Sequence, residues 1–293
     1  MGEIALRKVL DDYKTVYMPY RNFTQRTRVE YQNDLEDLIK FLEQLGITEV
    51  RDIGLPQLER YLAELDHRGM AGSTRKRKVV SIRSFLGYLY QDQYIRGNLA
   101  KRLIPPFAKP KSPGYLTKLE YEPLLAAASQ KPRDFALIQL LLQTGIKLSE
   151  LTDLTVNDVE LPSISQPDYE EMGYLHISRR ERQKARILPL NYKACLALNE
   201  YLKSRPSMII PALFINRFGK PLRPRGVEKI VGKYFQQIGL KNAKVQSLRH
   251  TFGIYHVSKG ATIKTIQEAM GYKDKRSAMI YISLKREMRI NPL

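Results

Sequence analysis

Hydrophobic residues in the first hundred positions recur at helical spacing in three successive segments. The first stripe consists of Leu35, Leu38, Ile39 and Leu42, the second of Leu58, Leu62 and Leu65, and the third of Val79, Ile82, Phe85, Leu86 and Leu89. Residues three and four apart share one face of a helix, so each stripe predicts an amphipathic helix. Breaks fall at Gly46, at Gly69 to Gly72 and after Gly97. We therefore expect a small helical domain with one core over about residues 24–100.

A proline-rich stretch at residues 104–113 interrupts this pattern. Its four prolines and the lack of a helical period predict an extended, stiff connector. After it, Thr117-Lys-Leu-Glu120 has the pattern of a capping box, in which both side chains satisfy free backbone N–H groups at a helix start. We therefore expect an N-terminal domain over residues 1–108, a linker over 109–116 and a second domain over 117–293.

The second domain is predicted to be mostly α with a small β-sheet, which is an α+β fold class. Helical patterns cover residues 135–142, 148–154, 193–203, 224–238, 247–259 and 263–270. Two short strands are predicted at residues 174–178 and 185–189, on either side of a highly charged turn.

Charge and composition narrow the choice of partner and compartment. The 49 Lys and Arg outnumber the 30 Asp and Glu, giving a net charge of +19 that favours a polyanionic partner. No uninterrupted apolar run reaches the roughly 18 residues of a spanning helix, and no secretory signal opens the chain, so we expect no membrane anchor. Cys195 is the only cysteine, which fits a reducing cytoplasm. No carboxylate or cysteine cluster surrounds His176 or His256, so no metal site is expected.

A run of four cations begins the third predicted helix. Arg75, Lys76, Arg77 and Lys78 follow Gly72-Ser-Thr, and Arg83 continues the positive charge. Such a run can be a solvated face, or it can bind DNA phosphates and enter a major groove. We expect DNA contact, and therefore a flatter salt dependence of DNA affinity in Arg77→Ala and Lys78→Ala.

The most specific pattern lies near the C-terminus. Gln246-Ser-Leu-Arg249-His250 is followed by Gly271-Tyr272 and by Tyr281, which comes 32 residues after Arg249. This register resembles the C-terminal signature of the tyrosine recombinases, the phage-integrase and Xer-type family. The segment 143–151 resembles the first box of that family, and residues 213–216 with 219–222 resemble its middle strand and turn. The resemblance covers nearly the whole chain.

The resemblance implies a two-domain clamp on duplex DNA that breaks and rejoins strands through a 3′-phosphotyrosyl intermediate. Tyr281 would attack the phosphate that Arg249 grips. Because the phosphotyrosine conserves the bond energy, neither a nucleotide cofactor nor a metal is implied. A homo-oligomer of two or four protomers on DNA would be needed, and the expected location is the cytoplasm, in association with the nucleoid. The tail after Tyr281 could pack on a neighbouring protomer or on its own domain.

Several family positions are exchanged in this sequence. The first arginine falls on Lys147, the first histidine on Gln246 and the late histidine or tryptophan on Tyr272, and each of these residues keeps a hydrogen-bond donor. Lysine presents a single point donor in place of a guanidinium fork, so the exchange is not neutral. By register the hairpin lysine falls on Glu181, although a slip of one residue would change this assignment.

The residues around Glu181 supply further candidates. Arg180 and Arg182 are expected to bind DNA, and Lys184 is our hypothesis for the acid that protonates the leaving oxygen. His250 is expected to be a hydrogen-bonded support. We expect weak or assembly-dependent activity. The main alternative is a catalytically inactive, sequence-specific DNA-binding protein on a recombinase scaffold, and RNA binding is a third possibility that charge alone suggests.

Overall fold

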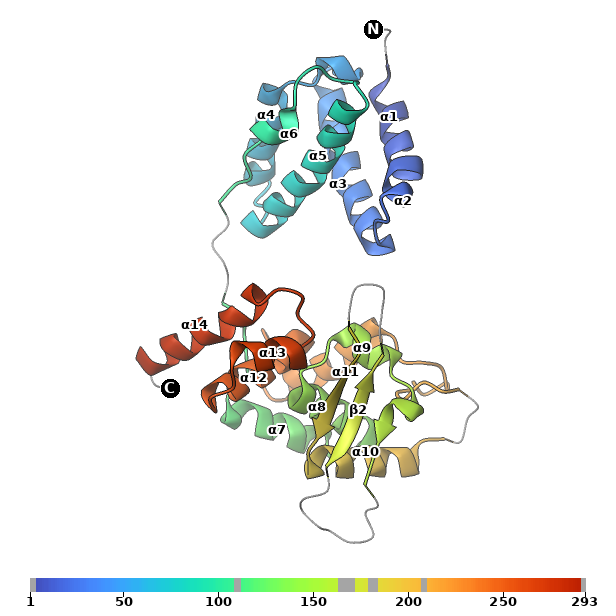
Figure 1. The fold of residues 1–293 in the computed structure, drawn as a ribbon, viewed down its shortest axis with the longest axis vertical. Coiled ribbons are helices and arrows are strands. Elements are labelled where there is room, and N and C mark those ends of the chain that lie inside the picture. Colours follow the sequence, from blue (N-terminus) through green and yellow to red (C-terminus); the bar gives the residue numbers. More distant parts are fainter. Residues whose placement is uncertain (1–3, 108–111, 163–171, 179–183, 207–209, 291–293) are drawn as a thin grey trace. The chain divides into compact units, whose positions relative to one another are not determined.

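A computed structural model describes residues 4–107, 112–162, 172–178, 184–206 and 210–290, with the backbone alone over 287–290. The chain divides into two compact units, Met1–Lys111 and Ser112–Leu293. Each unit has a hydrophobic core of its own, and the helices of both units are drawn in Figure 1. The predicted Arg180, Glu181 and Arg182 lie outside the described residues.

The first unit is helical. Its elements are α1 (Leu6–Asp12), the π-helix η1 (Tyr13–Tyr17), α2 (Met18–Tyr20), α3 (Gln25–Gln44), the 3-10 helix η2 (Val50–Asp52), α4 (Leu55–His67), α5 (Gly72–Gln91) and α6 (Leu99–Arg102). The three predicted stripes lie on α3, α4 and α5. All their members are buried except Leu62, which is partly buried against the same core. The three predicted helices are therefore confirmed.

The predicted start of this helical region at about residue 24 was wrong, because α1 begins at Leu6. Leu6, Val9, Leu10 and Tyr13 follow helical spacing and are buried. The Tyr13 hydroxyl donates a 2.7 Å hydrogen bond to Ser84 Oγ on α5. The N-terminal segment is thus an integral part of the first core.

The second unit is mostly helical with a small sheet, as the sequence predicted. Its helices are α7 (Lys118–Ala128), α8 (Pro132–Thr144), α9 (Leu148–Asp153), the 3-10 helix η3 (Val156–Asp158), α10 (Tyr192–Ser204), α11 (Pro224–Gln237), α12 (Val245–Ser258), α13 (Ile263–Ala269) and α14 (Arg276–Ile290). Glu120 accepts the backbone N–H of Thr117 at 2.8 Å, so the predicted capping box starts α7. The long helix α14 around Tyr281 was not predicted.

The sheet contains three antiparallel strands in the order β1 (Val159–Glu160), β2 (Gly173–Ile177) and β3 (Arg186–Leu190). Strands β2 and β3 are the two predicted ones, whereas β1 was not anticipated. Leu175 pairs with Leu188, and these side chains are buried together with Ile177 and Leu190. The predicted middle strand at 213–216 instead makes an isolated bridge, between Ile215 and Pro221.

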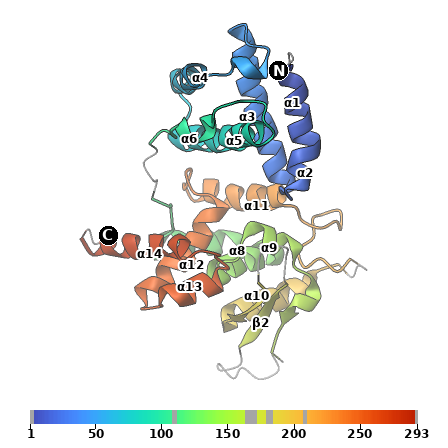
Figure 2. The same cartoon turned by 45° about the horizontal axis from the view of Figure 1, so that its top comes forward.

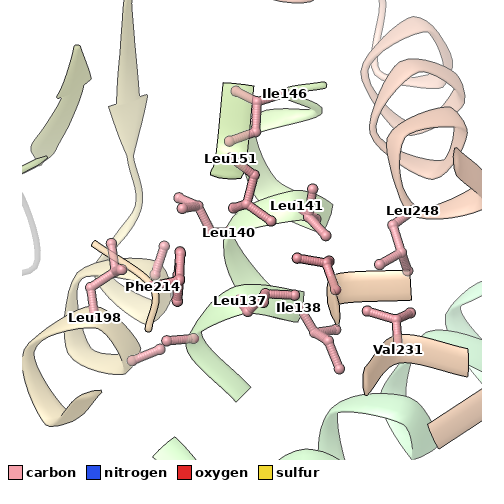
Figure 3. Packing of buried hydrophobic residues seen from close by; sticks show 14 of the residues in the cluster. Leu137, Ile138, Leu140, Leu141, Ile146, Leu151, Leu198, Phe214, Val231 and Leu248 are labelled. Carbon is pink, nitrogen blue, oxygen red and sulfur yellow. The ribbon is translucent and has the colours of Figure 1, made fainter. Parts of the chain in front are cut away.

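Helix α8 lies at the centre of the second core. Leu137, Ile138, Leu140 and Leu141 are all buried, so the helix is covered on several sides (Figure 3). Leu198 of α10 and Leu248 of α12 belong to the same cluster. Because α8 is enclosed, its C-terminus is a fixed point from which the following residues are positioned.

A separate hydrophobic cluster joins the last three helices of this unit, α12, α13 and α14 (Figure 2). It includes Ile254 of α12, Ile266 of α13, and Tyr281 and Leu284 of α14. Lys285 Nζ also donates to the Val257 carbonyl at 2.7 Å. The described part of the tail after Tyr281 therefore packs on its own domain.

Candidate active site

Tyr281 lies on the inner face of α14, and its side chain is 0% exposed. Gly253 of α12 makes room for the ring, because a Cβ at that position would lie 2.6 Å from the tyrosine Cζ. The Tyr281 hydroxyl oxygen is 3.0 Å from His250 Nδ1 and 2.9 Å from the Tyr272 hydroxyl. The candidate nucleophile is therefore held by two polar partners.

Burial raises the pKa of Tyr281, a hydrogen bond donated by Tyr281 to the Tyr272 hydroxyl raises it further, and Arg249 opposes both effects. If Tyr272 is the donor instead, the bond favours the phenolate. Burial is the largest of these effects, so the phenol is protonated at neutral pH. Its oxygen becomes a good nucleophile only when a neighbouring group takes the proton.

Arg249 of α12 is buried and faces the same cluster. Its guanidinium donates to the Gly145 carbonyl, and at 2.7 Å to the Met270 carbonyl. The Arg249 Cζ lies 4.8 Å from the centre of the Tyr272 ring. Arg249 is thus fixed by the C-terminal ends of α8 and α13, and it contacts Tyr272, which is hydrogen-bonded to Tyr281.

Lys147 directly precedes α9, and its side chain extends to the C-terminal end of α13, where Arg249 also binds. Its Nζ donates to the Gly271 carbonyl at 3.2 Å. The pKa of Lys147 is lowered by burial and by nearby Arg249 and Arg186, against an opposing effect of Glu150. The structure therefore brings together Tyr281, Arg249, Lys147 and Tyr272 from four separate parts of the sequence.

Glu150 and Arg186 are members of this cluster that the sequence reasoning missed. Two 2.9 Å hydrogen bonds join the Arg186 guanidinium to the two carboxylate oxygens of Glu150, and Arg186 Nε donates to the Ala269 carbonyl at 2.8 Å. Burial opposes ionisation of Glu150, but the hydrogen bonds from Arg186 hold its pKa below the usual value. A signal for Glu150 was present in the first box, three residues after Lys147.

Three cations therefore converge on the C-terminal end of α13. Arg186, Arg249 and Lys147 donate to the successive carbonyls of Ala269, Met270 and Gly271. These carbonyls lack partners within the helix and carry the negative end of its dipole, so they stabilise cations. Glu150 is the carboxylate that pairs with these cations among the residues that the structure describes, so the balance there is positive and suits a phosphodiester.

The other two predicted catalytic residues, Gln246 and Lys184, are both exposed. Gln246 is exposed at the start of α12, where it lines a cavity of about 280 Å³ together with Arg249. Lys184 is exposed just before β3. Among the parts of the chain that the structure describes, no group of His, Cys, Asp and Glu could hold a metal ion. His176 pairs with Glu160 at 3.2 Å, and His256 packs on the Phe252 ring.

His250 lies next to Arg249 on α12 and was expected to be a support. Its ring is partly buried, and burial together with Arg249 lowers its pKa to about 4. At neutral pH the imidazole is therefore uncharged, and one of its ring nitrogens can accept a proton.

The predicted DNA-binding cations of α5 differ in their surroundings. Lys76 is exposed, whereas Lys78 is buried, with its Nζ 2.8 Å from Asp37 and 3.4 Å from Asp34. Such a buried ammonium is held within the protein, so phosphate contact by Lys78 does not fit this structure.

The three arginines of this set also have partners within the protein. Arg75 pairs with Asp66, Arg77 with Asp34 and Glu30, and Arg83 donates to the Leu103 carbonyl. Lys76 is the most exposed of the five predicted cations, and the side chain of Arg77 is also 40% exposed although it is paired.

A tyrosine beside a fixed arginine on a mostly helical domain defines the class of tyrosine recombinases. The comparisons agree: residues 114–288 match the phage integrase family, and residues 10–93 match the phage integrase N-terminal SAM-like domain. The chain belongs to the phage integrase family.

Similar proteins of known name or structure extend over nearly the whole chain. The tyrosine recombinase XerC of Pelotomaculum thermopropionicum is 31% identical, over 95% of this chain and 94% of that protein. A structure of the XerH site-specific recombinase in a post-cleavage complex on palindromic difH aligns with a TM-score of 0.75 at 19% identity, over 96% and 83%. A lambda integrase dimer bound to a COC′ core site aligns with a TM-score of 0.75 at 17% identity, over 96% and 77%. These two likenesses show the fold.

Among the helices that the structure describes, none combines the length and the apolar character that crossing a bilayer requires.

Proposed function

We propose that the protein is a site-specific recombinase that binds duplex DNA and breaks and rejoins strands through a 3′-phosphotyrosyl intermediate on Tyr281. The observation that carries this proposal is the gathering of Tyr281, Tyr272, Arg249 and Lys147 around the C-terminal end of α13. The named relative is a tyrosine recombinase, which supports the same reaction.

In this mechanism the Tyr281 oxygen attacks the scissile phosphorus and the 5′-oxygen leaves. Negative charge grows on the non-bridging oxygens, and Arg249 and Lys147 hold that charge. Tyr272 adds a hydrogen bond at the nucleophile, and Gln246 adds one at the phosphate. Each exchanged family position costs on the order of 10²-fold in rate, by analogy with the loss of one preorganised donor, so activity is weak or depends on assembly.

The N-terminal domain, residues 1–108, acts as a DNA-binding domain, and residues 109–116 link it to the catalytic-like domain at 117–293. Lys76 binds phosphate directly, whereas Arg75, Arg77 and Arg83 reach DNA only by exchanging their present partners. Arg180 and Arg182 also bind DNA in this proposal. Two or four protomers assemble on DNA in the cytoplasm, as the dimeric DNA complex of lambda integrase suggests.

Covalent trapping tests this function. The protein is mixed with a random library of nicked duplexes and denatured, and the DNA that stays attached is recovered, with Tyr281→Phe alongside. We expect attachment that disappears in Tyr281→Phe, since the variant lacks the attacking oxygen. Selection of a specific sequence in native gels without any attachment would instead identify an inactive DNA-binding protein on a recombinase scaffold.

Lys184 is proposed as the acid that protonates the leaving 5′-oxygen, because it lies next to the charged hairpin turn. Lys184→Ala should slow strand cleavage on an ordinary phosphodiester by about 10²-fold or more, the usual contribution of a general acid. Unchanged cleavage rates in Lys184→Ala would refute this role.

A further inference from the structure

His250 has a position that its expected supporting role does not explain. Its Nδ1 lies 3.0 Å from the hydroxyl oxygen of Tyr281, which is within the range for proton transfer. At the family position where a histidine would otherwise lie near the phosphate, this chain has the amide of Gln246, which cannot take up a proton at neutral pH. The nucleophile therefore needs another proton acceptor.

We propose that His250 is the general base of strand cleavage, with its Nδ1 accepting the phenolic proton of Tyr281 as the tyrosine oxygen attacks the phosphate. This inference rests on the proposed function, and it adds the residue that activates the nucleophile.

The two hydrogen bonds at Tyr281 fit this role. If Tyr281 donates to His250 Nδ1, the Tyr272 hydroxyl donates to the Tyr281 oxygen across 2.9 Å. That second bond stabilises the negative charge that develops on the oxygen as its proton leaves. The imidazole is then the tautomer with its hydrogen on Nε2.

The surroundings of His250 keep it ready to accept a proton. The groups that face it are Arg249 on its own helix and Tyr281 on α14. Burial and the positive charge of Arg249 both disfavour the imidazolium, so the ring is neutral across the physiological range. An anionic phosphate bound at Arg249 would favour the imidazolium that forms during attack.

The other ionisable residues of the cluster are less suited to this task. Glu150 has both carboxylate oxygens bound by Arg186. Lys147 donates through its Nζ to the Gly271 carbonyl, and an ammonium group has no acceptor. Within the described part of the chain, His250 is the basic group in hydrogen-bond contact with Tyr281.

The proton balance of the step closes within the protein and the DNA. The O–H bond of Tyr281 breaks and its proton moves to His250 Nδ1, while a bond forms between the tyrosine oxygen and phosphorus. The bond from phosphorus to the 5′-oxygen breaks, and that oxygen takes a proton from Lys184. In rejoining, the 5′-hydroxyl gives its proton back to Lys184 as its oxygen attacks phosphorus, the bond from phosphorus to the Tyr281 oxygen breaks, and His250 returns its proton to that oxygen.

The test compares single-turnover cleavage by the full chain, His250→Asn and His256→Asn between pH 6 and 9, on the nicked duplex recovered by trapping. Asparagine keeps an acceptor near the Nδ1 position but is not a base. His256 is a matched control on the same helix, and it packs against Phe252.

We expect a flat profile for the unchanged protein and for His256→Asn. His250→Asn should be at least about 10²-fold slower at pH 7, and its rate should rise tenfold per pH unit, because the reaction then depends on the small phenolate fraction. If His250→Asn cleaved more slowly by the same factor at every pH, His250 would serve packing alone and the proposal would be overturned. A cleavage rate of His250→Asn equal to that of the unchanged protein would overturn it as well.

A duplex with sulfur in place of the bridging 5′-oxygen separates the base from the acid. A thiolate leaves without needing a proton, so this substrate should restore cleavage by Lys184→Ala but not by His250→Asn. Recovery of His250→Asn on the sulfur substrate would contradict the base role.

His250→Ala gives a second test, in which added imidazole should restore cleavage in a concentration-dependent manner. No restoration, with DNA binding intact, would count against proton transfer at this position. Absence of attachment by the unchanged protein would overturn the proposed function itself, whereas normal cleavage by His250→Asn would overturn only the role of His250.

Discussion

Replacing Gly253 with alanine should displace the nucleophile. The added Cβ would lie 2.6, 2.7 and 2.8 Å from three ring atoms of Tyr281. Carbon atoms in ordinary contact are about 3.5–4 Å apart, so the ring must move by about 1 Å. A movement of that size lengthens the hydrogen bonds of the Tyr281 hydroxyl to His250 and Tyr272 beyond their normal range.

The expected cost has a structural and a catalytic part. Overpacking a well-packed site costs about 1–3 kcal/mol, while alanine in place of glycine inside a helix stabilises by about 1 kcal/mol. Gly232→Ala is the matched control, since Gly232 lies in helix α11 of the same unit with nothing within 4 Å of the added Cβ. The difference in unfolding free energy between the two variants therefore isolates the overpacking, at about 2 kcal/mol.

Urea unfolding of the full chain, monitored by circular dichroism, measures the stability of both variants. Covalent trapping on the DNA site that the library experiment recovers measures cleavage by Gly253→Ala. A 1 Å misplacement of a reacting group costs about 10²-fold in rate. Gly232→Ala is the control for stability alone, because Gly232 lines the cavity that also contains Gln246 and Arg249. If Gly253→Ala were as stable as Gly232→Ala and cleaved DNA at the normal rate, the tight contact between α12 and α14 would be refuted.

Three further substitutions test the charges. Lys76→Ala should lower the salt slope of DNA affinity by about 1 and change stability by less than about 0.5 kcal/mol, whereas Lys78→Ala should cost about 3 kcal/mol in urea unfolding because it leaves Asp34 and Asp37 short of a partner. The reverse assignment, with Lys78→Ala changing only the salt slope, would show that Lys78 faces DNA. Glu150→Gln should cost about 3 kcal/mol at pH 7, since a buried Arg186 loses its counter-charge. The pKa of Glu150 in the folded protein lies below 4.5, so its contribution to stability is present above that pH and is lost as the pH falls through the folded pKa. Urea titrations at pH 7 and pH 4 should therefore show a smaller loss of unfolding free energy at acid pH in Glu150→Gln than in the unchanged protein. If Glu150→Gln and the unchanged protein lost the same unfolding free energy between pH 7 and pH 4, a group other than Glu150 would be responsible for the acid sensitivity.

Local periodicity was enough to predict most of the helices, and it also carried signals that were not used. Leu6, Val9, Leu10 and Tyr13 have the spacing of one helical face, so α1 was readable from the sequence. Lys78 lies four residues before Ile82 and seven before Phe85, both buried, so it occupies the inner stripe of α5, whereas Lys76 does not. The four-cation run therefore contained two kinds of residue that composition could not separate.

Other parts of the site depend on contacts between distant segments. Arg186 and Glu150 are 36 residues apart, and their pairing depends on the register of a hairpin that the sequence left open. The burial of Tyr281 on α14 depends on Gly253 on α12, which leaves space for the tyrosine ring. No local pattern predicts such contacts, because each needs the packing of α12, α13 and α14 to be known first.

The end of α13 explains why an exchanged residue set can still make a coherent site. Gly271 has a φ of +62°, and a Cβ there would lie 2.7 Å from the Arg186 guanidinium, so the position favours glycine on two grounds. The turn at Gly271 leaves three successive carbonyls facing Arg186, Arg249 and Lys147. Backbone carbonyls accept from a lysine as well as from an arginine, so Lys147 can keep the place of the family arginine although it lacks the bidentate fork. The backbone carbonyls thus hold Lys147 in place despite the exchange, although the lost fork still costs rate, whereas the contact of His250 with Tyr281 requires a particular side chain.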